Sequence, residues 1–88
     1  MSGKIGAELG DMLNLKKTLD TSAEKSVELT TSVKGVLGTT TWEGPAADRF
    51  RQAWTSEFEP ALKKLEQALK EAAGEVKRRH DALKEAGS

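Results

Sequence analysis

Apolar side chains recur at alternating spacings of three and four residues along the first part of the chain. This period is typical of a helix that packs along one stripe of its surface. Ser22 and Ser26 fall on the same stripe, where small side chains let a partner helix approach closely. We therefore predict a first helix over residues 5–37. Its stripe consists of Ile5, Met12, Leu15, Leu19, Leu29, Val33 and Val36.

A second helical pattern follows over residues 45–86. Phe50, Trp54 and Phe58 recur every four residues, which predicts that they share one helix face. Pro60 lies inside this pattern, and a proline in a helix interior costs about 3 kcal/mol. Because the apolar period continues across Pro60, we expect one kinked helix rather than two helices that meet just before it. The later part of the stripe consists of Leu62, Leu65, Leu69, Ala72, Val76 and Leu83.

The two patterns are separated by a short break that is rich in glycine and threonine. Glycine just after a helix and proline at the start of the next helix are common stop and start signals. We predict that Gly38 caps the first helix and that residues 38–44 form the turn. Gly44 is expected near the N-cap of the second helix, with Pro45 at its first position.

The predicted fold is all-α, with one antiparallel helical hairpin that comprises residues 1–88 as a single domain. Helices joined by so short a turn pack against each other, and this packing leaves Leu9, Leu13 and Val27 without cover. Because a buried large apolar side chain contributes about 1.5–3 kcal/mol, we expect two chains to pair as a four-helix bundle. The predicted packing face consists of Leu15, Leu19, Leu29, Val33, Phe50, Trp54, Phe58, Leu62, Leu65 and Leu69.

Composition narrows the possible functions. The chain has 88 residues, with 14 basic residues, 14 acidic residues, one histidine and no cysteine. Zero net charge gives no reason to expect a nucleic-acid partner, and this residue set argues against a metal or another cofactor. No apolar run approaches the ~20 residues of a membrane span. Residues 1–11 lack the apolar core of a secretory signal, so we expect a cytoplasmic protein unless another export route accepts it.

Residues 77–80 form one basic cluster, Lys-Arg-Arg-His. A solvated helix end, where cations interact favourably with the C-terminal dipole, explains this cluster more simply than a contact with nucleic acid or a membrane. His80 has no cysteine partner, and Ser88 at the terminus is the only hydroxyl residue near it. A thin bundle also offers no pocket for paired carboxylates. We therefore do not expect an enzyme.

A Trp-x-Gly tripeptide, Trp42 to Gly44, lies between the two predicted helices. Pro-Ala-Ala-Asp-Arg-Phe follows it at residues 45–50, and Trp54 comes shortly after. The whole chain resembles the WXG family of early-secreted-antigen-like proteins, which are substrates of the type VII (ESX) secretion system. The resemblance implies a helical hairpin that dimerises, is exported folded without a cleaved signal peptide and has no catalytic site. Trp42 and Gly44 match the tripeptide that contributes to recognition by the secretion machinery in that family.

The family pairs this tripeptide with a tail motif of tyrosine, three residues and then aspartate or glutamate. The chain has no tyrosine, and Lys84 lies four residues after His80, the nearest positional candidate. Three alternatives therefore remain open: a partner supplies the tail, the chain carries another signal, or the chain stays in the cytoplasm as an adaptor for a larger effector. Balanced charge and apolar stripes on both helices favour a homodimer over pairing with a paralogous WXG protein. A membrane-active protein is the weakest alternative, because it rests on amphipathicity alone.

Overall fold

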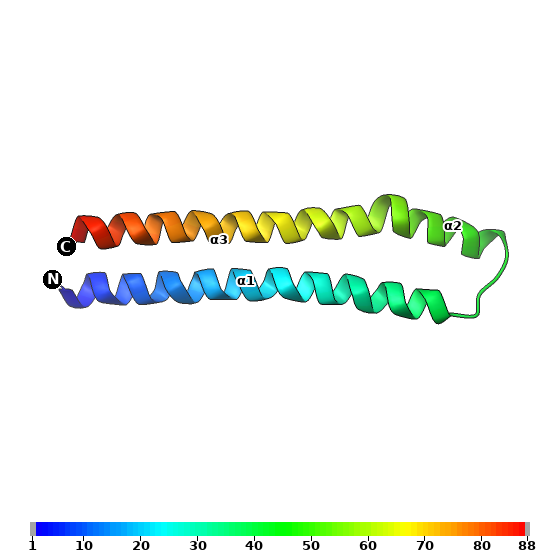
Figure 1. The fold of residues 1–88 in the computed structure, drawn as a ribbon, viewed down its shortest axis with the longest axis horizontal. Coiled ribbons are helices and arrows are strands. Elements are labelled where there is room, and N and C mark those ends of the chain that lie inside the picture. Colours follow the sequence, from blue (N-terminus) through cyan, green and yellow to red (C-terminus); the bar gives the residue numbers. More distant parts are fainter. Residues whose placement is uncertain (1, 88) are drawn as a thin grey trace.

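The computed structural model describes residues 2–87, so Met1 and Ser88 of the predicted domain lie outside it. The chain forms two long helical arms that lie antiparallel (Figure 1). The first arm is helix α1 (Ser2–Thr39). The second arm consists of helix α2 (Pro45–Ala53), the π-helical turn η1 (Trp54–Phe58) and helix α3 (Glu59–Gly87). The predicted all-α hairpin is therefore confirmed, as a rod of 66 × 18 × 12 Å.

The end of α1 differs from the sequence prediction, because Gly38 does not cap the helix. Gly38 is itself helical, and α1 ends at Thr39. Threonine hydroxyl groups take the place of a glycine cap: Thr39 Oγ1 donates to the carbonyl oxygen of Val36 at 3.2 Å, and Thr40 Oγ1 donates to the same oxygen at 2.6 Å. These bonds occupy a carbonyl group that the end of a helix leaves without a helical partner. The connecting loop therefore comprises residues 40–44 rather than 38–44.

The start of α2 agrees with the sequence prediction. Gly44 is the N-cap residue, and Pro45 opens the helix, where a missing backbone N–H has no cost. The backbone N–H of Asp48 donates to the carbonyl oxygen of Gly44 at 3.0 Å, which closes the first turn. The Asp48 carboxylate also lies in this first turn, where the helix dipole favours negative charge. This start fixes the direction in which the second arm leaves the loop.

The π turn η1 decides which side chains of the second arm face α1. Leu62 lies eight residues after Trp54, and an uninterrupted α-helix would separate the two by about 80° around its axis. The π turn takes up one extra residue and lowers this angle to about 20°. Trp54 is accordingly buried, and Leu62 is half-buried on the same side. Pro60 is the second residue after η1, and the wider turn gives room for the proline ring, which clashes with the preceding turn in a regular helix.

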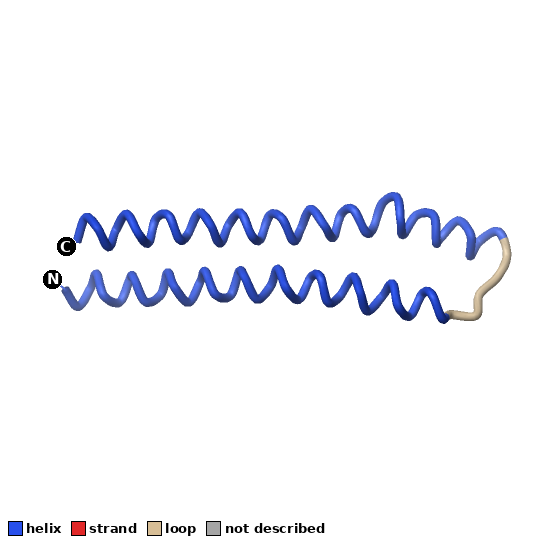
Figure 2. The backbone as a smooth tube through the Cα atoms, viewed as in Figure 1, coloured by secondary structure: helices blue, strands red, loops and turns tan. Residues whose placement is uncertain are grey.

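The second arm is continuous across Pro60, as the apolar pattern predicted (Figure 2). Small side chains provide the tightest packing between the two arms, and Ala23, Ser26 and Ala73 are buried. Among the described residues, no large side chain is fully buried, because two helices cannot surround one on all sides. We call this contact between the arms the hairpin seam. Its half-buried large apolar residues are Ile5, Leu9, Met12, Leu19, Leu37, Leu62, Leu69, Val76 and Leu83.

Candidate protein-binding surfaces

The loop between α1 and α2 presents the side chain of Trp42 at one end of the rod. Arg51, on α2, donates hydrogen bonds from its guanidinium group to the carbonyl oxygens of Trp42 at 2.8 Å and Thr40 at 3.1 Å. These two bonds hold the loop backbone against α2. The Trp42 ring packs on Phe50 with 5.7 Å between ring centroids, yet 42% of the residue is exposed. Trp42 is therefore fixed in position and accessible to a partner.

Gly44 holds a backbone conformation that other residues rarely adopt. Its φ is 110° and its ψ is 176°, a region that is essentially restricted to glycine. A Cβ atom at this position would meet no heavy atom within 4 Å, so the requirement for glycine comes from the backbone and not from packing. Within the tripeptide, Gly44 shapes the loop and Trp42 supplies the exposed side chain.

Gly44→Ala is expected to lower the free energy of unfolding by about 1–3 kcal/mol, because alanine must adopt this strained conformation. Gly38→Ala is the matched control, since Gly38 lies inside α1 with open space around its Cα. Alanine at a helical glycine position should raise the free energy of unfolding by about 1 kcal/mol. Urea unfolding followed by circular dichroism measures both changes. If the free energy of unfolding changed in the same direction in both variants, this role of Gly44 would be contradicted.

Phe50 and Phe58 extend the aromatic contact that begins at Trp42. Their ring centroids are 6.2 Å apart, and both side chains are exposed. Trp54 contacts Phe58 with 6.5 Å between centroids, but it is only 8% exposed. The three aromatic residues of the second arm therefore differ in exposure, with Trp54 buried and both phenylalanines exposed. Trp54 lies in the hairpin seam, and Phe50 and Phe58 lie outside it. We call Trp42, Phe50 and Phe58 the aromatic row.

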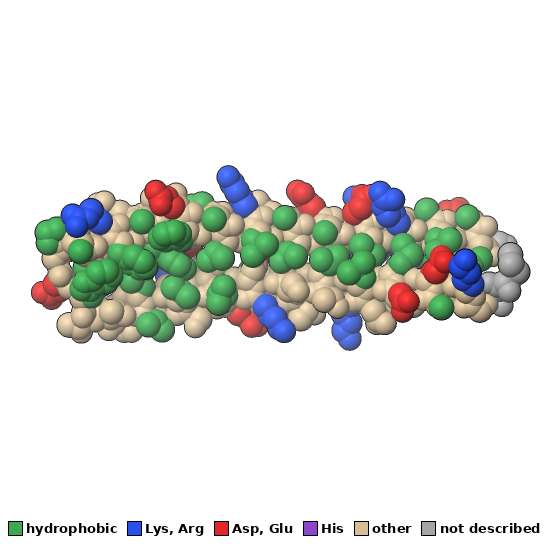
Figure 3. Space-filling view, turned by 180° about the vertical axis from the view of Figure 1, so that it is seen from behind, with side chains coloured by type: hydrophobic (Ala, Val, Ile, Leu, Met, Phe, Trp, Pro, Cys, Tyr) green, Lys and Arg blue, Asp and Glu red, His purple; other side chains and the backbone are tan. Residues whose placement is uncertain are grey.

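One broad side of the rod carries apolar side chains along its whole length (Figure 3). Helical geometry places Leu29 and Val33 on this side of α1, and Leu65 on the same side of α3. Leu13 and Val27 are also exposed, but they lie on the other side of α1. We call the continuous surface the apolar face. Its exposed residues are Leu15, Leu29, Val33, Val36, Phe50, Phe58 and Leu65.

The predicted packing residues thus divide between two surfaces. Trp54 is buried in the hairpin seam, and Leu19, Leu62 and Leu69 are half-buried there. The exposed members lie on the apolar face: Leu15, Leu29, Val33, Phe50, Phe58 and Leu65. Leu9, which was expected to lack cover, is half-buried. The apolar stripe that the sequence predicts is wider than the hairpin seam. Its residues therefore lie partly in the seam and partly on the apolar face.

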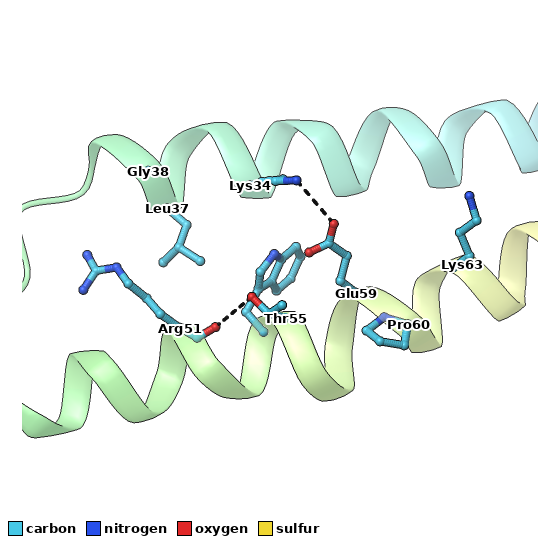
Figure 4. A pocket seen from close by; sticks show the side chains of 9 residues that line it. Lys34, Leu37, Gly38, Arg51, Thr55, Glu59, Pro60 and Lys63 are labelled. Carbon is cyan, nitrogen blue, oxygen red and sulfur yellow. Dashed lines mark hydrogen bonds and ion pairs between the residues drawn. The ribbon is translucent and has the colours of Figure 1, made fainter.

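The opposite broad side contains a groove between the two arms, which we call the polar groove. Its widest part has a volume of about 690 Å³ and lies beside the loop (Figure 4). No sequence pattern indicated this groove, because its basic residues come from separate segments and the direction of Arg51 depends on the π turn. An uninterrupted α-helix would place Arg51 about 20° from Leu62 around the axis, whereas the π turn moves it about 80° away, toward the groove. The side chains at this widest part include Lys34, Arg51, Trp54, Glu59 and Lys63.

Charged side chains along the polar groove form pairs within and between the arms. Lys34 of α1 lies 3.6 Å from a carboxylate oxygen of Glu59, which joins the two arms. Lys70 lies 2.8 Å from a carboxylate oxygen of Glu66. The hydrogen bond from Lys70, together with the positive charges of Lys70 and Lys63, holds the pKa of Glu66 below its ordinary value. Glu66 is therefore ionised at neutral pH and remains an acceptor in the groove.

The basic cluster at residues 77–80 is paired with carboxylates of its own helix. Arg78 and Arg79 both bind the carboxylate of Glu75, at 2.6 and 2.8 Å, and Lys77 binds Asp81 at 2.9 Å. Hydrogen bonds from Arg78 and Arg79 lower the pKa of Glu75. These ion pairs favour the interpretation of the basic cluster as a solvated helix surface. His80 lies in the hairpin seam, with its Nδ1 atom 2.9 Å from Asp81 Oδ1.

Residues 2–87 offer neither a metal site nor a membrane-spanning helix. Within that range, no group of three or more histidine, aspartate or glutamate side chains is placed to hold a metal ion. No helix in the same range is long and apolar enough to cross a membrane. The surfaces described above, namely the exposed tripeptide, the apolar face and the polar groove, are all suited to contacts with other proteins.

A family model, WXG100, described as proteins of 100 residues with WXG, matches residues 7–88. This range spans both helical arms and the loop between them, so it includes Trp42 and Gly44. No curated protein and no solved structure matches the chain significantly.

Proposed function

Because the chain belongs to the WXG100 family, whose members are small proteins associated with type VII secretion, we propose that it is a dimeric secretion substrate that acts by binding other proteins. The observation that carries this proposal is the geometry of the tripeptide. Trp42 is exposed at the end of the rod, and two hydrogen bonds from Arg51 and the conformation of Gly44 hold it there. A rigid, exposed indole is a suitable recognition element for a secretion machinery.

The exposed area of the chain supports pairing. A compact monomer of this mass exposes roughly 5,000 Å², whereas this chain exposes 6582 Å². The excess of about 1,500 Å² is more than the ~800 Å² that each partner contributes to a standard protein interface. The chain therefore has enough surplus surface to form one interface along its length.

The apolar face is the surface that pairing would cover. It runs along the rod on one side (Figure 3), so a second copy laid against it would complete a four-helix bundle with an apolar core. Equal numbers of acidic and basic residues mean that two copies do not repel each other strongly. We therefore favour a homodimer over pairing with a paralogous chain.

Light-scattering mass after size exclusion, with circular dichroism on the same sample, tests this pairing. A helical species of twice the chain mass supports the homodimer. A helical monomer at micromolar concentration, or a chain that becomes helical only when a paralogue is added, contradicts it. In this proposal the dimer is cytoplasmic before export, leaves the cell folded without a cleaved signal peptide, and has no enzymatic activity or cofactor.

A second candidate function is a cytoplasmic adaptor that pairs with a larger type VII effector. The chain contains no tyrosine, so it lacks the usual tail motif of the family, and this favours dependence on a partner for export. Purification of the chain from its native host distinguishes the two candidates. A larger protein in equal molar amount supports the adaptor, and a self-dimer in the culture medium supports the substrate.

A further inference from the structure

The polar groove extends well beyond its widest part. A second hollow of about 160 Å³ shares Glu59 and Lys63 with the hollow beside the loop. A third hollow of about 200 Å³ shares Val27 and Glu66 with the second. The three hollows therefore adjoin one another along the interface of the two arms. From Arg51 to Lys70 the groove follows about 28 Å of helix, which is the length of a segment of five helical turns.

The part of the groove beside the loop carries an excess of positive charge. Lys34, Arg51 and Lys63 line it together with one carboxylate, that of Glu59. Glu59 is paired with Lys34, and the Arg51 guanidinium binds only backbone carbonyl groups. Lys63 forms no ion pair with any residue of the described chain. Arg51 and Lys63 therefore have no carboxylate of the described chain within ion-pair distance, although the charge of Lys63 also acts on Glu66.

The same part of the groove is also lined by apolar side chains. Leu37 from α1 and Pro60 from α3 both line it, at positions that are offset along the groove (Figure 4). Trp54 lines the same part, and its buried indole Nε1–H has no hydrogen-bond acceptor within residues 2–87. A buried donor without an acceptor costs about 1–3 kcal/mol. The groove thus combines apolar contact area with two cations that form no ion pair within the described chain.

We propose that the polar groove binds an acidic, amphipathic segment of another protein. This inference rests on the proposed function, because it identifies a surface through which a dimeric secretion protein contacts a third chain. The groove lies on the side opposite to the apolar face, so it stays open when two copies pair. Carboxylates of the segment lie against Arg51 and Lys63, and its apolar side chains lie against Leu37 and Pro60.

A protein segment fits this groove better than a nucleic acid does. Nucleic-acid sites are strongly basic along their length, because affinity comes from neutralising many phosphates. Here the far part of the groove carries Glu24 and Glu66, so the excess of positive charge is confined to the part beside the loop, where the carboxylates of the bound segment lie. The alternation of apolar and charged groups instead matches an amphipathic helix, whose apolar stripe and charged flanks enter a groove together.

Binding can be measured with Trp54 as an internal reporter. Trp42→Phe leaves Trp54 as the single tryptophan of the chain. The probe is a synthetic 20-residue peptide with leucine at every third or fourth position and glutamate on both flanks, compared with a peptide in which each glutamate is glutamine. We expect the acidic peptide to change the Trp54 emission and to bind at least tenfold more tightly than the glutamine peptide. Equal affinity of the two peptides would overturn the proposal.

Charge reversal at one residue locates the binding site. Lys63→Glu places a negative charge in the groove, and Lys64→Glu makes the same change one residue later, at an exposed position outside the groove. We expect Lys63→Glu to weaken binding of the acidic peptide at least tenfold and Lys64→Glu to weaken it less than twofold. Circular dichroism verifies that both variants stay helical. Equal losses in the two variants, or tighter binding of a single-stranded oligonucleotide than of the peptide, would contradict a protein-binding groove.

The same samples separate this inference from the proposed function. If light scattering shows a dimer that does not bind the acidic peptide, the proposed binding groove is refuted and the proposed pairing stands. If the chain is a monomer and its binding of the peptide depends on Lys63, the proposed pairing is refuted and the proposed binding groove stands.

Discussion

Leu15→Glu is expected to raise the dissociation constant of the paired chain at least 100-fold. Leu15 lies on the apolar face and is 50% exposed in the single chain, so pairing would bury it. An unpartnered charge in an apolar interface costs several kcal/mol, and about 1.4 kcal/mol corresponds to a tenfold change. In a symmetric homodimer the substitution occurs twice, which doubles its effect. Sedimentation equilibrium or light scattering over a concentration series measures the dissociation constant.

Leu13→Glu is the matched control for this prediction. Leu13 is also 50% exposed and also lies on α1, but on the side away from the apolar face. The same change in charge and in side-chain volume at Leu13 should alter the dissociation constant less than threefold. A dimer that tolerates glutamate at Leu15 but not at Leu13 would mean that pairing occurs through the opposite side of the rod.

Trp42→Ala is expected to reduce export at least tenfold while the helical content stays near that of the wild type. Trp42 makes its ring contact with Phe50 at the end of the rod, outside the hairpin seam, so its loss removes little packing. The hydrogen bonds from Arg51 go to backbone carbonyl groups and do not depend on the indole. The measurement is the amount of protein in the medium of a secretion-competent host, relative to the amount inside the cells.

Phe58→Ala tests whether any exposed aromatic residue of the row would have the same effect. Phe58 is exposed to a similar degree as Trp42 and lies in the same aromatic row, but outside the tripeptide. Because Phe58 also belongs to the apolar face, light scattering must first show that the variant still forms a dimer. Export of the paired variant should then stay within twofold of the wild type. Undiminished export of a folded Trp42→Ala protein would refute the recognition role, and equal losses in both variants would indicate that the row acts as a packing surface.

The main elements of the hairpin were predictable from local chemistry. The three-and-four spacing of apolar residues indicates the helices, and Gly44 followed by Pro45 marks the start of the second arm, because few residues other than glycine adopt its backbone conformation. The end of α1 was less predictable, since Thr39 and Thr40 cap it through their hydroxyl groups while Gly38 stays helical. Both residue types can end a helix, and sequence alone does not decide between them.

The division of apolar residues between the hairpin seam and the apolar face was not predictable from spacing. The seam buries Ala23, Ser26 and Ala73 most completely, and such small residues give a weak signal in an apolar pattern. Trp54 and Phe58 looked equivalent in a period of four, but Trp54 is buried and Phe58 is exposed. The polar groove depends on the π turn, so it was not visible in the sequence.

The π turn also has a consequence for alignments of this chain with related helical hairpins. Along the second arm, η1 is equivalent to the insertion of one residue into a regular helix. A relative without this turn would need a one-residue gap within residues 54–58 to bring both halves of the arm into structural register. An ungapped alignment that is correct for the seam residues after Pro60 would therefore pair Trp54 and the residues before it with structurally wrong positions.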